Sequence, residues 1–208
     1  MRPTTLAVLS AMTIAHGAGA GPGSARGDEG SAHPAAAVRR LTACHGTPAE
    51  IAALESHVAA RMPGHGRAFH RRLAAAIHEE AVHAGFDPLL VLALIHVESA
   101  FDPEAVSPAG AVGLMQLHET TMRQEAERSR LGRADPRDPV ANVRAGVRYL
   151  RRLVATFGST DLALMAYNAG PNRIGSYRRA GGVPERFHAY PRRVRGEVQR
   201  LRVESRRR

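Results

Sequence analysis

One carboxylate stands out by its position in the sequence. Glu98 follows the almost entirely apolar stretch from Leu89 to Val97, three residues after Ile95 and four after Leu94, on the same face of a helix. Burial and the negative end of a helix dipole both disfavour the anion, so both would raise the pKa of this carboxyl. A carboxyl that is still protonated near neutral pH can donate a proton to a leaving oxygen. Taken alone, Glu98 also fits a simpler interpretation, a charged residue where a helix meets water.

The elements that position Glu98 are predicted to be helices. Asp87-Pro88 pairs an N-cap with proline at the first helical position, and so starts the helix that ends near Glu98. An amphipathic pattern from about residue 66 stops at Gly85. Further helices are predicted over about 138–154, 160–167 and 191–203. Residues 102–113 hold two prolines and two glycines, which indicates a loop. No strand pattern is present, so the predicted fold class is all-α, or mainly α.

The N-terminal part is predicted to be organised differently. A positive start, an apolar run over residues 6–15 and Ala18-Gly19-Ala20 follow the order of a secretory signal peptide. We therefore expect a signal peptide over residues 1–20 and export to the periplasm or cell envelope; the alternative is a disordered tail. The run is too short to leave a transmembrane segment in the mature chain. Residues 21–65 are predicted to be a linker, with a short helix over 48–61, and residues 66–204 the helical domain.

Composition limits the classes of partner. The 29 basic residues, all arginine, exceed the 19 acidic ones and give a net charge of +10. A basic surface attracts anionic polymers, and an anionic envelope polymer is favoured here, although so complete an arginine bias also fits codon composition. Basic clusters with interleaved aromatics are lacking, so no nucleic-acid partner is expected.

Cysteine and histidine give no metal or cofactor site. Cys44 is the single cysteine, so no internal disulfide can form. The stretch 41–44 resembles a lipoprotein acylation box, but Arg39-Arg40 precedes it where an apolar run should stand, so a free thiol is the default. The eleven histidines lack a ligand pattern completed by cysteine or carboxylate, and no phosphate-binding glycine loop is present.

Three blocks of sequence resemble the signatures of one enzyme family. Residues 98–117 read ESAFDPEAVSPAGAVGLMQL, residues 138–150 read DPVANVRAGVRYL, and residues 166–171 read AYNAGP. In this order they resemble the soluble lytic transglycosylase family, and the resemblance covers about residues 75–195. It does not extend to residues 21–64.

The resemblance implies a lysozyme-like helical fold and an activity on peptidoglycan. Members of the family cleave the β-1,4 bond between N-acetylmuramic acid and N-acetylglucosamine without water and leave a 1,6-anhydro end. Glu98, at the matching position, would protonate the leaving oxygen and then act as base on the muramyl C6 hydroxyl. Hydrolysis by paired carboxylates needs a second Asp or Glu about 5 to 9.5 Å away. Asp102 and Glu104 lie nearby in the loop, and Asp102 is interpreted as a turn or cap residue.

The same resemblance implies that five further residues line the substrate groove: Ser107, Met115, Gln116, Tyr167 and Asn168. Each also has a structural interpretation. Ser107 could form a turn before Pro108, Met115 could be core or groove wall, and Gln116 could be a helix-surface amide. Tyr167 could be a core aromatic residue, and Asn168 could cap its helix.

The chain departs from the family pattern at two places. His118-Glu119 stands where Met-Pro is common, and the stretch from Glu185 to Pro191 has no clean match for a glutamate that usually precedes a tyrosine there. Two alternatives therefore stay open: a goose-type-like muramidase that hydrolyses, and an inactive wall-binding component of an envelope-spanning machine. Partners beyond the glycan strands, such as a secretion, conjugation or flagellar apparatus, are left open by the sequence.

Overall fold

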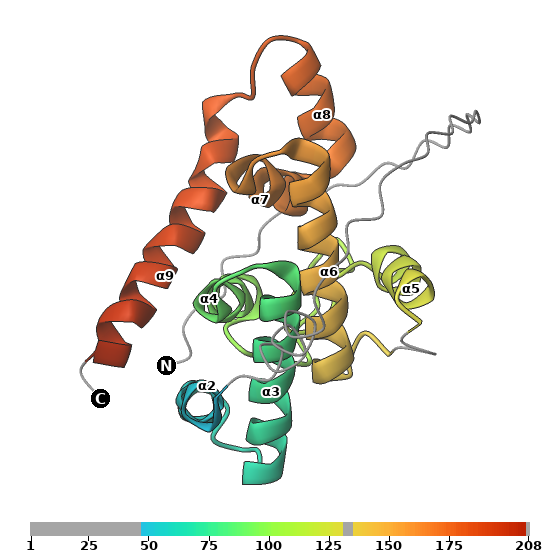
Figure 1. Ribbon diagram of the computed structural model, residues 1–208. Coiled ribbons are helices and arrows are strands. Elements are labelled where there is room, and N and C mark those ends of the chain that lie inside the picture. The colour runs from blue at the N-terminus through green and yellow to red at the C-terminus, as the bar shows by residue number, and fades with distance from the viewer. Residues whose placement is uncertain (1–46, 131–134, 207–208) are drawn as a thin grey trace, which may run out of the picture.

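Short local signals begin and end the helices of the structure. The computed structural model describes residues 47–130 and 135–206 (Figure 1). Its helices are α2 (Pro48–Arg61), α3 (Arg67–Ala84), α4 (Pro88–Ser99), α5 (Glu119–Arg128), α6 (Pro139–Phe157), α7 (Thr160–Ala169), α8 (Pro171–Arg179), the 3-10 helix η1 (Glu185–His188) and α9 (Ala189–Arg206). Aspartate caps begin two of them, since the Asp87 side chain accepts from the Leu89 amide and Asp138 from the Ala141 amide. Gly85 ends α3 at a φ of 73°, a conformation in which glycine is free of strain.

Helix α4 is the centre of the core, as its composition predicts. Its residues 91–95 are completely buried. It packs against α3 on one side and the long helix α9 on another, while α6 packs against α3, α5 and α7 (Figure 1). The fold is mainly helical, and the described residues contain no sheet, only the isolated bridges Val106 to Val112 and Val112 to Leu117. The predicted fold class is confirmed.

Helix α2 belongs to the packed domain. Thr47 and Glu50 form a capping box at its start, and it packs against α3. Leu54 and Val58 are buried in the common core. Helix α2 spans the residues of the short helix expected over 48–61 and packs with the helices that follow it. The predicted signal peptide, the segment 21–37 and Cys44 lie outside the described residues.

The sequence patterns did not predict α5, α8 or η1. Helix α5 has only Met122 and Ala126 as apolar residues that reach the core, and α8 buries Ile174 and Gly175. So few apolar positions leave no helical period to detect. Within residues 47–130 and 135–206, no single helix is long and apolar enough to cross a bilayer; α3 and α4 meet that test only as a pair, bent by 117°.

Candidate active site

Glu98 lies in the last turn of α4, where the chain leaves the core in an unusual conformation. Its side chain is partly buried. The two residues that follow Ser99 both have positive φ, 52° at Ala100 and 66° at Phe101. Non-glycine residues adopt this conformation at a cost that surrounding contacts must offset. Here Phe101 is buried in the core, so its packing holds the turn that presents Glu98.

The carboxyl of Glu98 has the protonation behaviour that the sequence suggested. Desolvation by burial raises its pKa to about 7, against the opposing effects of a hydrogen bond from Tyr190 and the positive charge of Arg193. The Tyr190 hydroxyl donates to Glu98 Oε1. Burial and the neighbouring Glu98 raise the pKa of Tyr190 well above its usual range, so the tyrosine remains a donor. The carboxyl can therefore hold or release a proton near neutral pH.

Two more tyrosines extend this cluster. The Tyr167 hydroxyl donates to the carbonyl oxygen of Met115 at 2.8 Å. Burial, and then the charge of Glu98, raise the pKa of Tyr167 well above its ordinary value. The Tyr149 ring packs on Tyr167 with 5.3 Å between centroids, and burial raises the pKa of Tyr149 to about 12. The phenols are thus neutral donors around a single titrating carboxyl.

The loop between α4 and α5 is held by side chains from α4 and α6. Ser99 Oγ donates to the Leu114 carbonyl at 2.9 Å. The buried Asn142 of α6 accepts from the Met115 amide at 2.8 Å and donates to the carbonyls of Val112 and Pro136. The bonds to the Leu114 carbonyl and the Met115 amide satisfy backbone groups of the loop. The loop is therefore fixed relative to the end of α4.

Gly113 is required where this loop meets α6. Its φ is 81°, and a Cβ built on it would lie 2.6 Å from both Asn142 Nδ2 and the Pro136 carbonyl oxygen. A side chain at this position would displace the amide that holds the loop. Gly113 of the first family block is thus explained by its backbone conformation together with the close approach of Asn142 and Pro136.

The five residues expected to line the groove have different environments. Ser107 Oγ accepts from the Ala111 amide at 3.0 Å and closes a turn. Gln116 lies in the loop with a φ of 47°, not on a helix, and its Nε2 donates to the carbonyls of Ala105 and Gly113. The Met115 side chain is completely buried, which gives it a packing role in this structure. Tyr167 and Asn168 are partly exposed in the last turn of α7.

The other acidic residues near Glu98 in sequence are turned to solvent. Asp102 is exposed, and its Oδ1 accepts from the Glu104 amide at 2.9 Å, as expected of a turn residue. The Glu104 side chain is 70% exposed, with Arg137 at 3.8 Å. Over residues 47–130 and 135–206, three or more His, Cys, Asp or Glu side chains do not come together in a way that could hold a metal ion.

The two departures from the family pattern have different surroundings in the structure. His118 precedes α5 without a side-chain cap hydrogen bond. Arg186 donates to the Tyr177 hydroxyl at 2.8 Å, and its guanidinium lies over the Phe187 ring at 4.7 Å. Arginine therefore occupies this position as an exposed cation held by aromatic rings.

Sequence reasoning did not assign Tyr190 or Arg193 to the site. Both belong to the start of α9, and the Arg193 guanidinium lies 5.7 Å from the centre of the Tyr190 ring. A signal was available, because family members often show a tyrosine in the stretch that here runs from Glu185 to Pro191.

Comparisons with known proteins agree with this fold. The family described as "Transglycosylase SLT domain" matches residues 75–187. The chain is 39% identical over 115 residues to membrane-bound lytic murein transglycosylase F of Alcanivorax borkumensis, covering 50% of this chain and 23% of that protein. It is 36% identical over 87 residues to the transglycosylase of Enterobacteria phage PRD1, covering 42% of this chain and 31% of that protein. The chain thus spans about a quarter to a third of the length of these relatives.

Solved structures show the same fold. An inactive mutant of the lytic transglycosylase Slt from Pseudomonas aeruginosa matches with a TM-score of 0.55 and 26% identity, over 61% of this chain and 23% of that one. The 70 kDa soluble lytic transglycosylase of Escherichia coli also matches with a TM-score of 0.55, at 23% identity, over 72% of this chain and 28% of that one. The family match covers more than half of the chain and contains Glu98, the Met115 loop and Tyr167. The chain therefore belongs to the transglycosylase SLT domain family.

Proposed function

We propose that this protein is a peptidoglycan lytic transglycosylase in which Glu98 is the catalytic residue. The observation that supports this most is the environment of Glu98, a carboxyl whose pKa is raised to about 7 by desolvation and whose Oε1 accepts from Tyr190. A group that titrates near the working pH can serve as acid in one step and base in the next. The inactive mutant of the Pseudomonas aeruginosa relative replaces a glutamate by glutamine, which agrees with a single essential carboxyl.

In the first step, the protonated Glu98 donates its proton to the glycosidic oxygen, and the bond from that oxygen to the muramyl C1 breaks. The N-acetylglucosamine side leaves as an alcohol. In the second step, the Glu98 carboxylate removes the proton of the muramyl C6 hydroxyl, and that oxygen forms a bond to C1. The product is a 1,6-anhydro end, water is neither consumed nor released, and Glu98 regains its proton.

The tyrosines have a positioning role in this scheme. The Tyr190 hydroxyl donates to the carboxylate that forms after the first step, and such a bond favours the charged form. Desolvation acts in the opposite direction and keeps the resting carboxyl protonated. Because the hydrogen bond and desolvation oppose each other, the pKa of Glu98 stays near neutral, and the same carboxyl can donate a proton and later accept one.

The residues proposed to contact the sugar chain are chosen by their exposure and by their place in the loop or at the end of α7. Ser107, Gln116, Tyr167 and Asn168 are partly exposed and belong to the loop or to the end of α7, so they are proposed to contact the sugar chain. Met115 is proposed to act through its backbone, since its amide and carbonyl are bound by Asn142 and Tyr167. A periplasmic or cell-envelope location, where glycan strands are accessible, is part of the same proposal.

The experiment that tests this function is mass analysis of the muropeptides released from purified cell walls. The protein is expected to release 1,6-anhydro ends, each one water lighter than a reducing end. Reducing ends would instead identify a hydrolase. The Glu98→Gln variant is expected to release no product while still sedimenting with the walls. If the parent protein binds walls without releasing any product, a binding role replaces the enzymatic one.

A further inference from the structure

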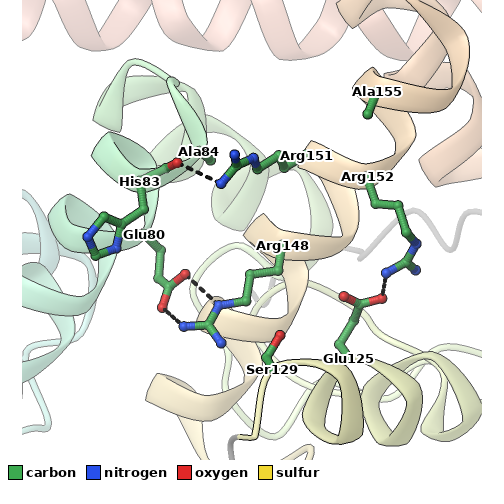
Figure 2. Close-up of a pocket in the computed structure, with 9 residues that line it drawn as sticks. All are labelled: Glu80, His83, Ala84, Glu125, Ser129, Arg148, Arg151, Arg152 and Ala155. Carbon is green, nitrogen blue, oxygen red and sulfur yellow. Dashed lines mark hydrogen bonds and ion pairs between the residues drawn. The ribbon is translucent and has the colours of Figure 1, made fainter. Parts of the chain in front are cut away.

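A cavity lies on α3, α5 and α6, and the guanidinium of its lining residue Arg152 lies 5.2 Å from the centre of the Tyr149 ring. It has a volume of about 480 Å³ and shares no lining residue with the cluster around Glu98. Figure 2 shows Arg148 and Arg151 extending from α6 toward α3, and Arg152 extending toward α5. The volume is in the range of cavities that bind small ligands.

The cavity has more positive than negative groups. Arg148 holds the buried Glu80 with two hydrogen bonds, of 2.8 and 2.6 Å, and Arg152 is bound to the buried Glu125. Arg151 is different, because in the described part of the chain its guanidinium donates to a backbone carbonyl and not to a carboxylate. The lining thus contains three arginines against two glutamates.

The excess of positive charge persists when neighbouring groups are included. Arg144 lies 3.7 Å from Glu80 and 3.3 Å from Glu79, and Arg128 lies 3.4 Å from Glu125. The whole cluster has five arginines and three glutamates, and His83 lies at its edge. An anionic ligand would therefore be attracted to the cavity.

The Arg151 guanidinium is held in place before any ligand arrives. Its Nη1 donates to the His83 carbonyl at 2.8 Å, which joins α6 to the end of α3. A guanidinium has five donors in a fixed plane, so one bond to a carbonyl leaves others to face a carboxylate. Holding a flexible side chain in advance reduces the entropy lost on binding.

From this geometry we propose that the cavity lined by Arg148, Arg151 and Arg152 binds the carboxylates of a peptidoglycan stem peptide. The choice of ligand rests on the proposed function, because the anionic groups of the proposed substrate polymer are the carboxylates of its short peptides. Arginine forks match carboxylates in geometry. The cavity would then anchor the enzyme to the peptides of the wall while Glu98 acts on the sugar chain.

The test compares two exposed arginines with the same change of charge. Arg151→Gln removes the cavity arginine that donates to a backbone carbonyl and not to a carboxylate. Arg71→Gln, the control, removes a cation of α3 that has no ion pair with another described residue and lies twelve residues before His83, about 18 Å along the helix. Binding of a free stem tetrapeptide is measured by titration calorimetry on the full chain, with inorganic phosphate as a competing probe.

The parent protein and the Arg71→Gln variant are expected to bind the tetrapeptide with equal affinity, and Arg151→Gln about tenfold more weakly, as for loss of one charge-assisted hydrogen bond. Amide resonances of Ser129 and Arg151 should shift on titration of the parent protein, which tests the location without any variant. The proposal is overturned if the parent shows no saturable binding, if both variants bind alike, or if equimolar phosphate displaces the peptide.

Cleavage assays separate this inference from the proposed function. On stem-free glycan strands, Arg151→Gln should cleave as fast as the parent protein; on strands that keep their peptides it should show a higher KM. If Arg151→Gln and the parent protein have the same KM on strands that keep their peptides, the peptide site is contradicted and the enzymatic proposal stays intact. If the parent protein cleaves neither substrate, the enzymatic proposal is contradicted. The binding titration then still decides whether the peptide site exists.

Discussion

Glu98→Gln is expected to stabilise the folded protein at neutral and alkaline pH. In the fold, desolvation raises the pKa of Glu98 from 4.5 to about 7. Below about pH 4.5 the carboxyl is protonated in both the folded and the unfolded chain, so it does not change the free energy of unfolding. As the pH rises toward 7, the unfolded chain releases the proton first, and the free energy of unfolding falls. Above about pH 7 the carboxyl is ionised in both states, and the free energy of unfolding falls no further.

The magnitude follows from that difference in pKa. One pH unit corresponds to about 1.4 kcal/mol, so the ionised carboxyl lowers the free energy of unfolding by about 3 kcal/mol at pH 8. Glutamine resembles the neutral carboxylic acid and can still accept from Tyr190. The variant should therefore match the parent protein at pH 4 and exceed it by about 3 kcal/mol at pH 8.

Urea denaturation of both proteins at pH 4, 6 and 8, followed by circular dichroism, measures this difference. Glu104→Gln is the control, since the Glu104 side chain is 70% exposed and reports the general effect of removing a surface charge. A gap between parent and Glu98→Gln that stays constant with pH, or that closes as the pH rises, would refute the reasoning. The same result would remove the basis for Glu98 as an acid near neutrality.

Two further substitutions test the surroundings of Glu98. Tyr190→Phe removes a hydrogen bond that lowers the pKa of Glu98. The alkaline limb of the kcat/KM profile on glycan strands should therefore move up by about one pH unit. An unchanged profile would mean that the bond does not act on catalysis. Gly113→Ala introduces a Cβ 2.6 Å from Asn142 Nδ2 at a φ of 81°, and should lower the free energy of unfolding by about 2 kcal/mol or more. Thermal unfolding beside Gly110→Ala, where φ is 79° but the space is open, separates the steric clash from the cost of the backbone conformation.

Local signals in the sequence predicted most of the helices and the place of Glu98 at the end of a buried helix. Asp87-Pro88 and Gly85 act within one helical turn, so they can be recognised without knowledge of the fold. The apolar stretch before Glu98 indicated a buried helix, and α4 is the centre of the core. Helices α5 and α8 escaped prediction because they bury too few side chains to show a period. Thus helix starts, helix ends and the position of the carboxyl are properties of short segments.

The environment that makes Glu98 useful is decided by the tertiary structure. Tyr190 is 92 residues from Glu98 in sequence, and the two meet because α9 packs along α4. Asn142 reaches the Met115 loop from α6 in the same way, across 27 residues. The Gln116 amide, for which a helix surface was the alternative to a groove contact, binds the loop carbonyls of Ala105 and Gly113. A pattern read along the chain can locate a carboxyl at the end of a buried helix, but desolvation and hydrogen bonds depend on which distant segments pack around it.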